Sequence, residues 1–215
     1  MSFTRKLLAW YKRNARVLPW RQTRNPYAIL VSEFMLQQTQ VSRVLDYYPR
    51  FLQRFPSLEA LARSRPKAVM EAWEGLGYYA RARNLHKLAR QVTRRHDGTL
   101  PEDPEALRTL PGVGRYTAGA VACFAYEKPV ATVDTNVRRV LERVFAPDEV
   151  WAFASEIVPK NGKRAWRFNQ ALMELGALVC TARTPKCPTC PVRSECRYAA
   201  RPSSRTRSRA RARPG

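Results

Sequence analysis

The chain has 215 residues, of which 45% are hydrophobic and 26% charged, so most of it is expected to fold as one compact body or two small lobes. A formal net charge of +22, from 39 Lys and Arg against 17 Asp and Glu, predicts a polyanionic partner, most commonly nucleic acid. No apolar stretch approaches the ~20 residues that span a bilayer, and the N-terminus does not resemble a secretory signal peptide, so we expect a cytoplasmic, nucleoid-associated protein without membrane contact.

The positive charge is not confined to one end of the chain. Residues 201–215 contain six arginines and no acidic residue, and this low-complexity tail is predicted to be disordered. The rest of the chain is strongly basic without it. A solvated basic surface or attraction to anionic lipid are alternative explanations, so charge alone does not identify the polyanion.

Prolines divide the chain into short segments whose apolar residues recur at helical spacing, as from Phe34 to Leu45. Phe55-Pro56-Ser57 is typical of a turn followed by a helix N-cap. Segment 130–137 is briefly strand-like, but its Asp134 fits equally well as the N-cap of the next helix, so we predict an all-α fold. Further boundaries are expected at Leu18-Pro19, Asn25-Pro26, Arg65-Pro66, Leu100-Pro101, Asp103-Pro104 and Leu110-Pro111.

The segment LPGVGRYTAGA, residues 110–120, is predicted to be a tight turn followed by a helix. It lacks the lysine and hydroxyl residue of a nucleoside-triphosphate loop and has no G-x-G-x-x-G fingerprint. Its glycines let the backbone approach a ligand, and the first N–H groups of the helix point outward. This pattern fits a helix-hairpin-helix that binds a DNA phosphate without reading sequence, and a plain turn between packed helices is the alternative. The amides concerned are those of Gly112, Val113, Gly114 and Arg115.

Four cysteines lie within a short C-terminal stretch in the pattern C-x6-C-x2-C-x5-C. In a cytoplasmic protein they are expected to be reduced or metal-bound. A zinc ribbon usually offers two C-x2-C knuckles, whereas this loop has one, so the spacing favours a [4Fe–4S] cluster over zinc. The ligands would be Cys180, Cys187, Cys190 and Cys196. Cys123, alone in an apolar run, is predicted to be a buried core thiol.

Six segments of the chain, spread over about residues 5–200, resemble those of adenine DNA glycosylases of the MutY type, in the same order. That family belongs to the helix-hairpin-helix superfamily, which includes endonuclease III. The segments are VSEFMLQQTQV (31–41), WEGLGYYARARNLH (73–86), LPGVGRYTAGA (110–120), VDTNVRRVLERVF (133–145), FNQALMELGALVC (168–180) and the cysteine loop. The resemblance implies two helical lobes with a DNA groove between them. These would be a [4Fe–4S] lobe from residues 1–21 and 133–200, and a lobe with the hairpin from residues 22–132.

The resemblance also implies chemistry by two carboxylates. When a purine leaves deoxyribose, the sugar becomes an oxocarbenium ion, and a pair of carboxylates can protonate the base and stabilise that cation. By resemblance, Glu33 protonates the base and Asp134 stabilises the sugar. Apolar neighbours such as Val31, Phe34 and Met35 are expected to raise the pKa of Glu33 by desolvation. A surface helix position for Glu33 and a plain N-cap for Asp134 are the alternatives.

Four further residues are assigned by resemblance to handling of the flipped base. Gln37 and Tyr78 match positions that enter the base stack, and an amide and a planar aromatic suit that wedge. The glycines on either side of Leu76 suggest that Tyr78 lies in an exposed turn rather than in the core. Leu30 and Gln170 match positions at the base pocket, where an amide can both donate to and accept from a purine edge.

Tyr116 and Asn136 match positions that hold or surround the reacting nucleotide. Bifunctional relatives of the endonuclease III type carry a lysine at the place of Tyr116, and its amine attacks the sugar and leads to strand cleavage. Tyrosine has no such amine, so we expect hydrolysis by water, with an intact strand as product.

Three features depart from the usual adenine enzyme. The chain ends in an arginine tail where that enzyme continues into a domain that reads 8-oxoguanine, Thr135 replaces a glycine, and Leu30 replaces a tryptophan. Leu30 is similar to thymine mismatch glycosylases, whereas Gln37-Gln38 and Gln170 agree with the adenine pattern.

These features together predict a monomeric, monofunctional glycosylase. Its expected substrate is adenine mispaired with guanine or 8-oxoguanine in double-stranded DNA. Thymine or uracil opposite guanine is the alternative substrate. A non-catalytic iron–sulfur DNA-binding protein is the alternative of a different class, and the presence of both Glu33 and Asp134 argues against it.

Overall fold

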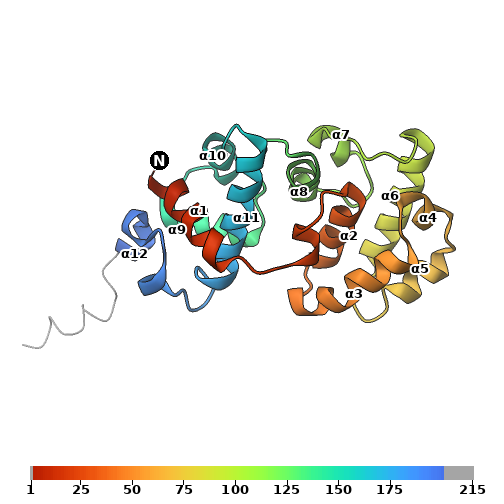
Figure 1. Ribbon diagram of the computed structural model, residues 1–215, viewed down its shortest axis with the longest axis horizontal. Helices are drawn as coiled ribbons and strands as arrows, with labels where there is room; N and C mark the ends of the chain where they lie inside the picture. The colour runs from red at the N-terminus through yellow and green to blue at the C-terminus, as the bar shows by residue number, and fades with distance from the viewer. Residues whose placement is uncertain (1, 201–215) are drawn as a thin grey trace, which may run out of the picture. The chain divides into compact units, whose positions relative to one another are not determined.

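The computed structural model describes residues 2–200, so the predicted disordered tail, residues 201–215, lies outside the described residues. Between residues 2 and 200 the chain forms α-helices and short 3-10 helices and no β-strand, which confirms the predicted all-α fold (Figure 1). None of the described helices is both long enough and apolar enough to cross a membrane.

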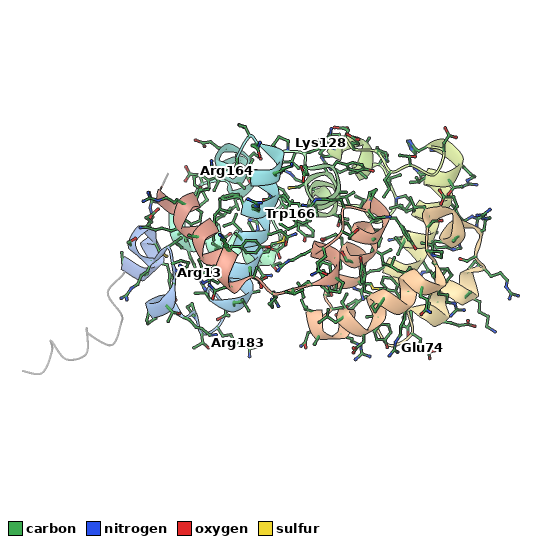
Figure 2. The ribbon with its side chains drawn as sticks, viewed as in Figure 1. Arg13, Glu74, Lys128, Arg164, Trp166 and Arg183 are labelled. Carbon is green, nitrogen blue, oxygen red and sulfur yellow. The ribbon has the colours of Figure 1, made fainter. Side chains whose placement is uncertain are left out.

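The chain folds into two compact units. The hairpin unit consists of residues 16–132 and 159–166, and the cysteine unit consists of residues 2–15, 133–158 and 167–200. Two segments belong to a different unit from the lobe that was predicted for them. Trp20 packs edge-on against Tyr48, with ring centroids 5.4 Å apart, which holds residues 16–21 in the hairpin unit. The guanidinium of Arg24 lies 4.5 Å from the ring centroid of Trp166, and this contact holds residues 159–166 there. Trp166 is labelled in Figure 2.

The hairpin unit is built around α2, in which nine of eleven residues are buried. Because this helix is apolar on all sides, it packs against η1, α3, α6 and α8. The helices of the unit are η1 (Pro19–Arg21), α2 (Pro26–Leu36), α3 (Val41–Arg54), α4 (Leu58–Arg63), α5 (Pro66–Ala72), α6 (Ala80–Arg95), α7 (Pro104–Arg108) and α8 (Arg115–Tyr126).

The cysteine unit has a core of aromatic rings contributed by several helices. Phe145 packs against Phe3 and Phe153 with ring centroids 4.9 Å apart in both pairs, and Phe168 lies 6.4 Å from Phe3. The helices are α1 (Ser2–Asn14), α9 (Thr135–Phe145), α10 (Val150–Ile157), most of α11 (Gly162–Leu178), η2 (Cys187–Thr189), η3 (Arg193–Glu195) and α12 (Arg197–Ala200).

Side-chain caps define several of the boundaries predicted from the sequence. Asn25 accepts a hydrogen bond from Ala28 N at the start of α2, and Ser57 accepts one from Ala60 N at the start of α4. Asp134 caps α9 through Val137 N at 2.6 Å, which confirms the cap rather than a strand at this position. Each such cap stabilises its helix by about 1 kcal/mol.

Candidate active site and cysteine cavity

Glu33 lies on α2, inside the hairpin unit, and only 5% of its surface is exposed. Its sequence neighbours Val31, Phe34 and Met35 are almost completely buried too, so a surface position for Glu33 is excluded. Burying an ionisable group costs free energy, and such groups concentrate at functional sites.

Asp134 begins α9 in the cysteine unit, and both of its carboxylate oxygens accept hydrogen bonds. Val137 N donates to Oδ1, and the amide Nδ2 of Asn136 donates to Oδ2 at 3.0 Å. The side chain of Asp134 is half-buried. Asp134 is therefore the helix cap and also holds the predicted site residue Asn136.

A line of hydrogen bonds leads from Asn136 to the first cysteine of the loop. Arg139 donates from Nη2 to Asn136 Oδ1 and to the carbonyl oxygen of Gly176, both at 2.8 Å, and from Nε to Cys180 O at 2.7 Å. The helices α9 and α11 come close together here, since a Cβ added to Gly176 would lie 2.7 Å from Cβ of Asn136. The site carboxylate and the cysteine loop thus share one arginine-centred network.

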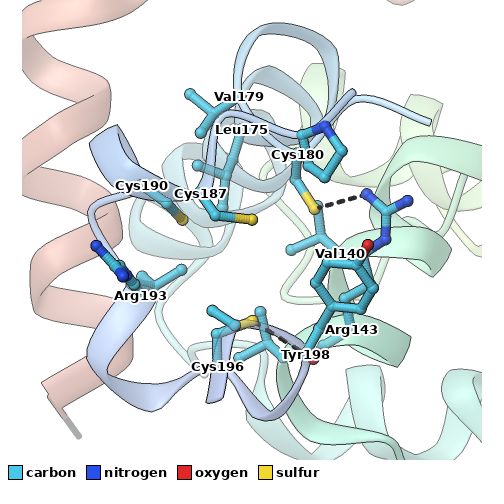
Figure 3. Close-up of a pocket in the computed structure, with 14 residues that line it drawn as sticks. Val140, Arg143, Leu175, Val179, Cys180, Cys187, Cys190, Arg193, Cys196 and Tyr198 are labelled. Atoms are coloured by element: carbon cyan, nitrogen blue, oxygen red, sulfur yellow. Dashed lines mark hydrogen bonds between the residues drawn. The ribbon is translucent and has the colours of Figure 1, made fainter. Parts of the chain in front are cut away.

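The four clustered cysteines line a single pocket in the cysteine unit (Figure 3). The walls between them are apolar and include Val140, Leu175 and Val179. None of the four is in a disulfide. Burial raises the pKa of the Cys190 thiol, and the other three cysteines raise it further. Figure 3 shows the four side chains around the same space.

The cysteine side chains around the pocket limit the kinds of metal group that it could hold. Within residues 2–200, no three Cys, His, Asp or Glu side chains are gathered as ligands of a single metal ion. One zinc ion requires four sulfurs at about 2.3 Å from one point. A cubane cluster takes each of its four thiolates on a different iron, so four cysteines around one pocket have the chemistry of its ligand set.

Arg143 holds the first part of the cysteine loop against α9. It donates to Thr181 O at 2.7 Å and to Ala182 O at 2.8 Å, and Nη1 lies 3.5 Å from Cys180 Sγ. Its guanidinium also lies 4.9 Å from the ring centroid of Tyr198. The loop is therefore tied to α9 at the Cys180 end.

The glycine turn predicted between residues 110 and 115 is present between α7 and α8. Gly112 has φ of +77°, and an added Cβ would lie 2.8 Å from Asn84 Cβ and 3.0 Å from the ring of Phe34. The turn is thus pressed onto α6 and α2. Gly114, which is exposed, caps α8 without a side-chain hydrogen bond, and the half-buried Tyr116 lies in the first turn of the helix. Val113 is buried and Arg115 is exposed.

Tyr78 lies in an exposed turn, as its flanking glycines suggested. Its side chain is 59% exposed, and its φ is +47°. Gln37, in contrast, is half-buried at the end of α2, where Nε2 lies 3.5 Å from Thr117 Oγ1. The exposed amide is Gln38, with φ of +57°. The sequence could not separate two adjacent glutamines, because only the end of α2 at Leu36 decides which one is exposed.

The two residues predicted for the base pocket are both buried. Leu30 of α2 is completely buried in the hairpin unit, and Gln170 of α11 is 5% exposed in the cysteine unit. The predicted site residues therefore fall into two groups. The hairpin unit carries Leu30, Glu33, Gln37, Tyr78, the turn 112–115 and Tyr116, and the cysteine unit carries Asp134, Asn136, Gln170 and the four cysteines.

Comparison with known proteins gives consistent matches. The chain is 46% identical to an adenine DNA glycosylase of Mycolicibacterium smegmatis over 90% of this chain and 68% of that protein. It is 46% identical to an adenine DNA glycosylase of Rattus norvegicus over 91% of this chain and 41% of that protein. An adenine DNA glycosylase of Mycobacterium tuberculosis is 49% identical over 86% of this chain and 64% of that protein. The chain thus spans less than two thirds of the length of the rat and M. tuberculosis relatives.

Solved structures and a family model agree with these matches. A thermostable thymine-DNA glycosylase superposes with a TM-score of 0.86 at 33% identity, covering 92% of this chain and 94% of that one. A trapped endonuclease III–DNA covalent intermediate gives a TM-score of 0.80 at 25% identity, covering 97% of this chain and 95% of that one. Residues 31–161 match the model of the HhH-GPD superfamily base excision DNA repair protein. The chain therefore belongs to the HhH-GPD superfamily of base excision DNA repair proteins, as its sequence motifs indicated.

Proposed function

We propose that this protein is a monofunctional DNA glycosylase that removes adenine mispaired with guanine or 8-oxoguanine from double-stranded DNA. The observation that carries the proposal is the buried carboxyl of Glu33 on a rigid helix, in a chain similar over nine tenths of its length to proteins named adenine DNA glycosylase. The positive charge of the chain and its glycine turn support DNA as the partner.

The reaction that we propose begins when the target base leaves the stack. Gly112 to Arg115 would hold a backbone phosphate, and Tyr78 would fill the gap left by the base. Glu33 then donates its proton to the adenine ring as the N-glycosidic bond breaks, so the base leaves as a neutral molecule.

The second half of the reaction uses the other carboxylate. Asp134 stabilises the positive charge of the oxocarbenium sugar, and Asn136 keeps that carboxylate in place through its 3.0 Å hydrogen bond. Water adds to C1′ and loses its proton to solvent or to the Glu33 carboxylate. Tyr116 has no amine that could form a covalent bond with the sugar, so the product is an intact strand with an abasic site.

We infer that Cys180, Cys187, Cys190 and Cys196, which line one pocket, would hold a [4Fe–4S] cluster. When bound, such a cluster would cross-link the loop through four iron–thiolate bonds. Around it, Arg143 would keep the Cys180 end of the loop against α9. The exposed side chains of Arg183, Lys186 and Arg193 would offer positive charge to DNA phosphates.

The experiment that tests the function uses four duplexes, each with one A:G, A:8-oxoG, T:G or U:G pair, under single-turnover conditions. Alkali added afterwards cleaves the strand at any abasic site. We expect cleavage at adenine in the first two duplexes. An intact A:G strand beside a cleaved T:G strand would reject the adenine assignment.

A thymine or uracil glycosylase is the second candidate. The match to the thermostable thymine-DNA glycosylase structure covers almost all of both chains. In addition, Leu30 replaces the tryptophan usual in the adenine family. The same four duplexes separate the two candidates. Cleavage of T:G and U:G without cleavage at adenine would establish the second.

A further inference from the structure

Arg81, in the first turn of α6, is 6% exposed, although arginine is seldom buried. Its Nη1 donates to three backbone carbonyls at the C-terminal end of α2, those of Phe34 at 3.0 Å, Met35 at 2.7 Å, and Gln37. The last carbonyls of a helix have no partner within the helix. The guanidinium of Arg81 therefore completes the end of α2 from a helix that begins more than 40 residues later.

The other side of the same guanidinium binds the turn that carries Tyr78. Nη2 donates to the carbonyls of Leu76 at 3.2 Å and Gly77 at 3.0 Å, and Nε donates to Tyr78 O at 3.4 Å. Nη2 also donates to Thr39 Oγ1 at 3.0 Å. One planar group thus joins two segments of the chain that lie about 40 residues apart in sequence.

Aromatic rings complete the environment of Arg81. The guanidinium carbon lies 5.4 Å from the ring centroid of Trp73 and 5.5 Å from that of Tyr78. Every hydrogen-bond acceptor around it is an uncharged oxygen, so no carboxylate offsets the cost of burying the charge. Multiple carbonyl dipoles and two ring faces offset this cost instead.

The two segments that Arg81 joins carry the two exposed side chains with positive φ near the end of α2. Gln38 follows Gln37 directly, and Tyr78 follows Gly77. Positive φ is unfavourable for residues other than glycine and persists only where surrounding structure imposes it. The hydrogen bonds of Arg81 to Gln37 O and Thr39 Oγ1 around Gln38, and to Gly77 O and Tyr78 O at Tyr78, supply that constraint.

We propose that Arg81 is a positioning residue that locks the segments Gln37–Thr39 and Leu76–Tyr78 together, so that Gln38 and Tyr78 are arranged to enter the base stack before DNA binds. The proposal rests on the proposed glycosylase function. Arg81 acts on extrusion of the base and not on bond cleavage. Lysine cannot replace it, because one ammonium lacks the planar fork that reaches both segments.

The test is a double-mutant cycle of Arg81→Gln with Tyr78→Ala, measured as single-turnover base removal from a mismatched duplex. If Arg81 acts through Tyr78, we expect Arg81→Gln to slow the reaction about 10- to 100-fold in the wild-type background and less than about 3-fold in the Tyr78→Ala background. Equal losses in both backgrounds would overturn the proposal. Arg83→Gln, an exposed arginine two residues further along α6, is the matched control and should leave the rate unchanged.

Further measurements separate a positioning role of Arg81 from a role in folding. Fluorescence of 2-aminopurine placed beside the target base should report slower extrusion of that base by Arg81→Gln than by the wild type. On a duplex whose target base faces an abasic site, the rates of base removal by Arg81→Gln and the wild type should differ much less. Arg81→Lys should recover little of the lost rate. Full recovery would show that positive charge alone is needed, and would contradict the claim that the planar guanidinium must bind both segments. If Arg81→Gln does not fold, Thr39→Val, which removes one acceptor of the same fork, should show the same selective slowing to a smaller degree.

Failure of the inference is distinguishable from failure of the function. A wild-type protein that cleaves none of the mismatched duplexes would reject the glycosylase proposal. An active wild-type protein whose Arg81→Gln and Tyr78→Ala effects simply multiply would reject only the positioning role.

Discussion

The two units hold their irregular functional segments in different ways. In the hairpin unit, Arg81 is buried and joins the end of α2 to the Tyr78 turn through uncharged oxygens, so protein groups alone complete the structure. In the cysteine unit, Arg139 and Arg143 fix the start of the loop at Cys180, but the rest of the loop consists of 3-10 turns around a cavity. The hairpin unit is therefore expected to be pre-organised without a cofactor, and the cysteine loop to depend on one.

The two predicted catalytic carboxylates, Glu33 and Asp134, also lie in different surroundings. Glu33 is almost completely buried on the apolar helix α2, which suits a group that gives up a proton. Asp134 begins a helix and accepts hydrogen bonds from Val137 and Asn136, which suits a fixed anion beside a developing cation. The environment of each side chain therefore favours a different role in the proposed reaction.

The largest expected effect is on Glu33. Glu33→Gln keeps the size of the side chain but removes the proton donor, so we expect the single-turnover rate to fall about 10³-fold with DNA binding nearly unchanged. Glu74→Gln, at an exposed position of the same unit, is the control. A Glu33→Gln enzyme that retains more than a tenth of the rate would remove Glu33 from the proposed chemistry.

Replacing a cysteine of the loop should change the cysteine unit and leave the Tyr78 turn of the hairpin unit unchanged. Purified wild-type protein should be brown with broad absorbance in the near-visible, and Cys187→Ser should lose this absorbance and weaken DNA binding at least about 10-fold. Hydrogen exchange should increase in the cysteine loop but not in the Tyr78 turn. Cys123→Ala, which changes the buried cysteine outside the loop, should keep the colour. Colourless zinc-loaded protein would contradict the cluster.

Arg139 tests the link between the loop and the site carboxylate. Arg139→Gln removes hydrogen bonds to Asn136, Gly176 and Cys180, and we expect a loss of about 1–3 kcal/mol in the free energy of unfolding together with slower base removal. The neighbouring Arg138→Gln, which removes only an exposed 3.6 Å ion pair with Glu142, is the control. Equal effects of the two substitutions on the free energy of unfolding and on base removal would show that the hydrogen bonds of Arg139 do not link the loop to the site carboxylate.

The smallest expected effects compare two glycines of the same turn, Gly112 and Gly114. Gly112→Ala places a Cβ at φ of +77° against Asn84, so we expect it to cost about 1–2 kcal/mol from the backbone alone and to weaken DNA binding. Gly114→Ala meets no atom within 4 Å and has φ of −88°, so it should change the free energy of unfolding by less than about 1 kcal/mol. A reversed order of the two, measured by urea unfolding, would contradict the turn geometry.

Local patterns predicted much of this molecule. The caps at Ser57 and Asp134, the glycine turn and the cysteine loop depend on residues close in sequence, and the structure has each where the sequence indicated. The buried guanidinium of Arg81 was not predicted, because its partners lie about 40 residues away and nothing in the segment YYARAR distinguishes Arg81 from Arg83.

Long-range packing also decides the features of the fold that the sequence left open. The membership of residues 16–21 in the hairpin unit depends on the contact of Trp20 with Tyr48, which no local pattern reveals. The exposure of Gln38 rather than Gln37 depends on where packing ends α2. Such features require the tertiary structure because their causes are contacts between distant segments.

The most direct test of the central claim is incubation of wild-type protein with a duplex that carries one A:8-oxoG pair, followed by electrophoresis with and without alkali and by borohydride trapping. We expect a strand break only after alkali, and no covalent complex, since Tyr116 has no amine to attack the sugar. Strand cleavage without alkali, together with borohydride trapping as strong as that of an endonuclease III control, would contradict it.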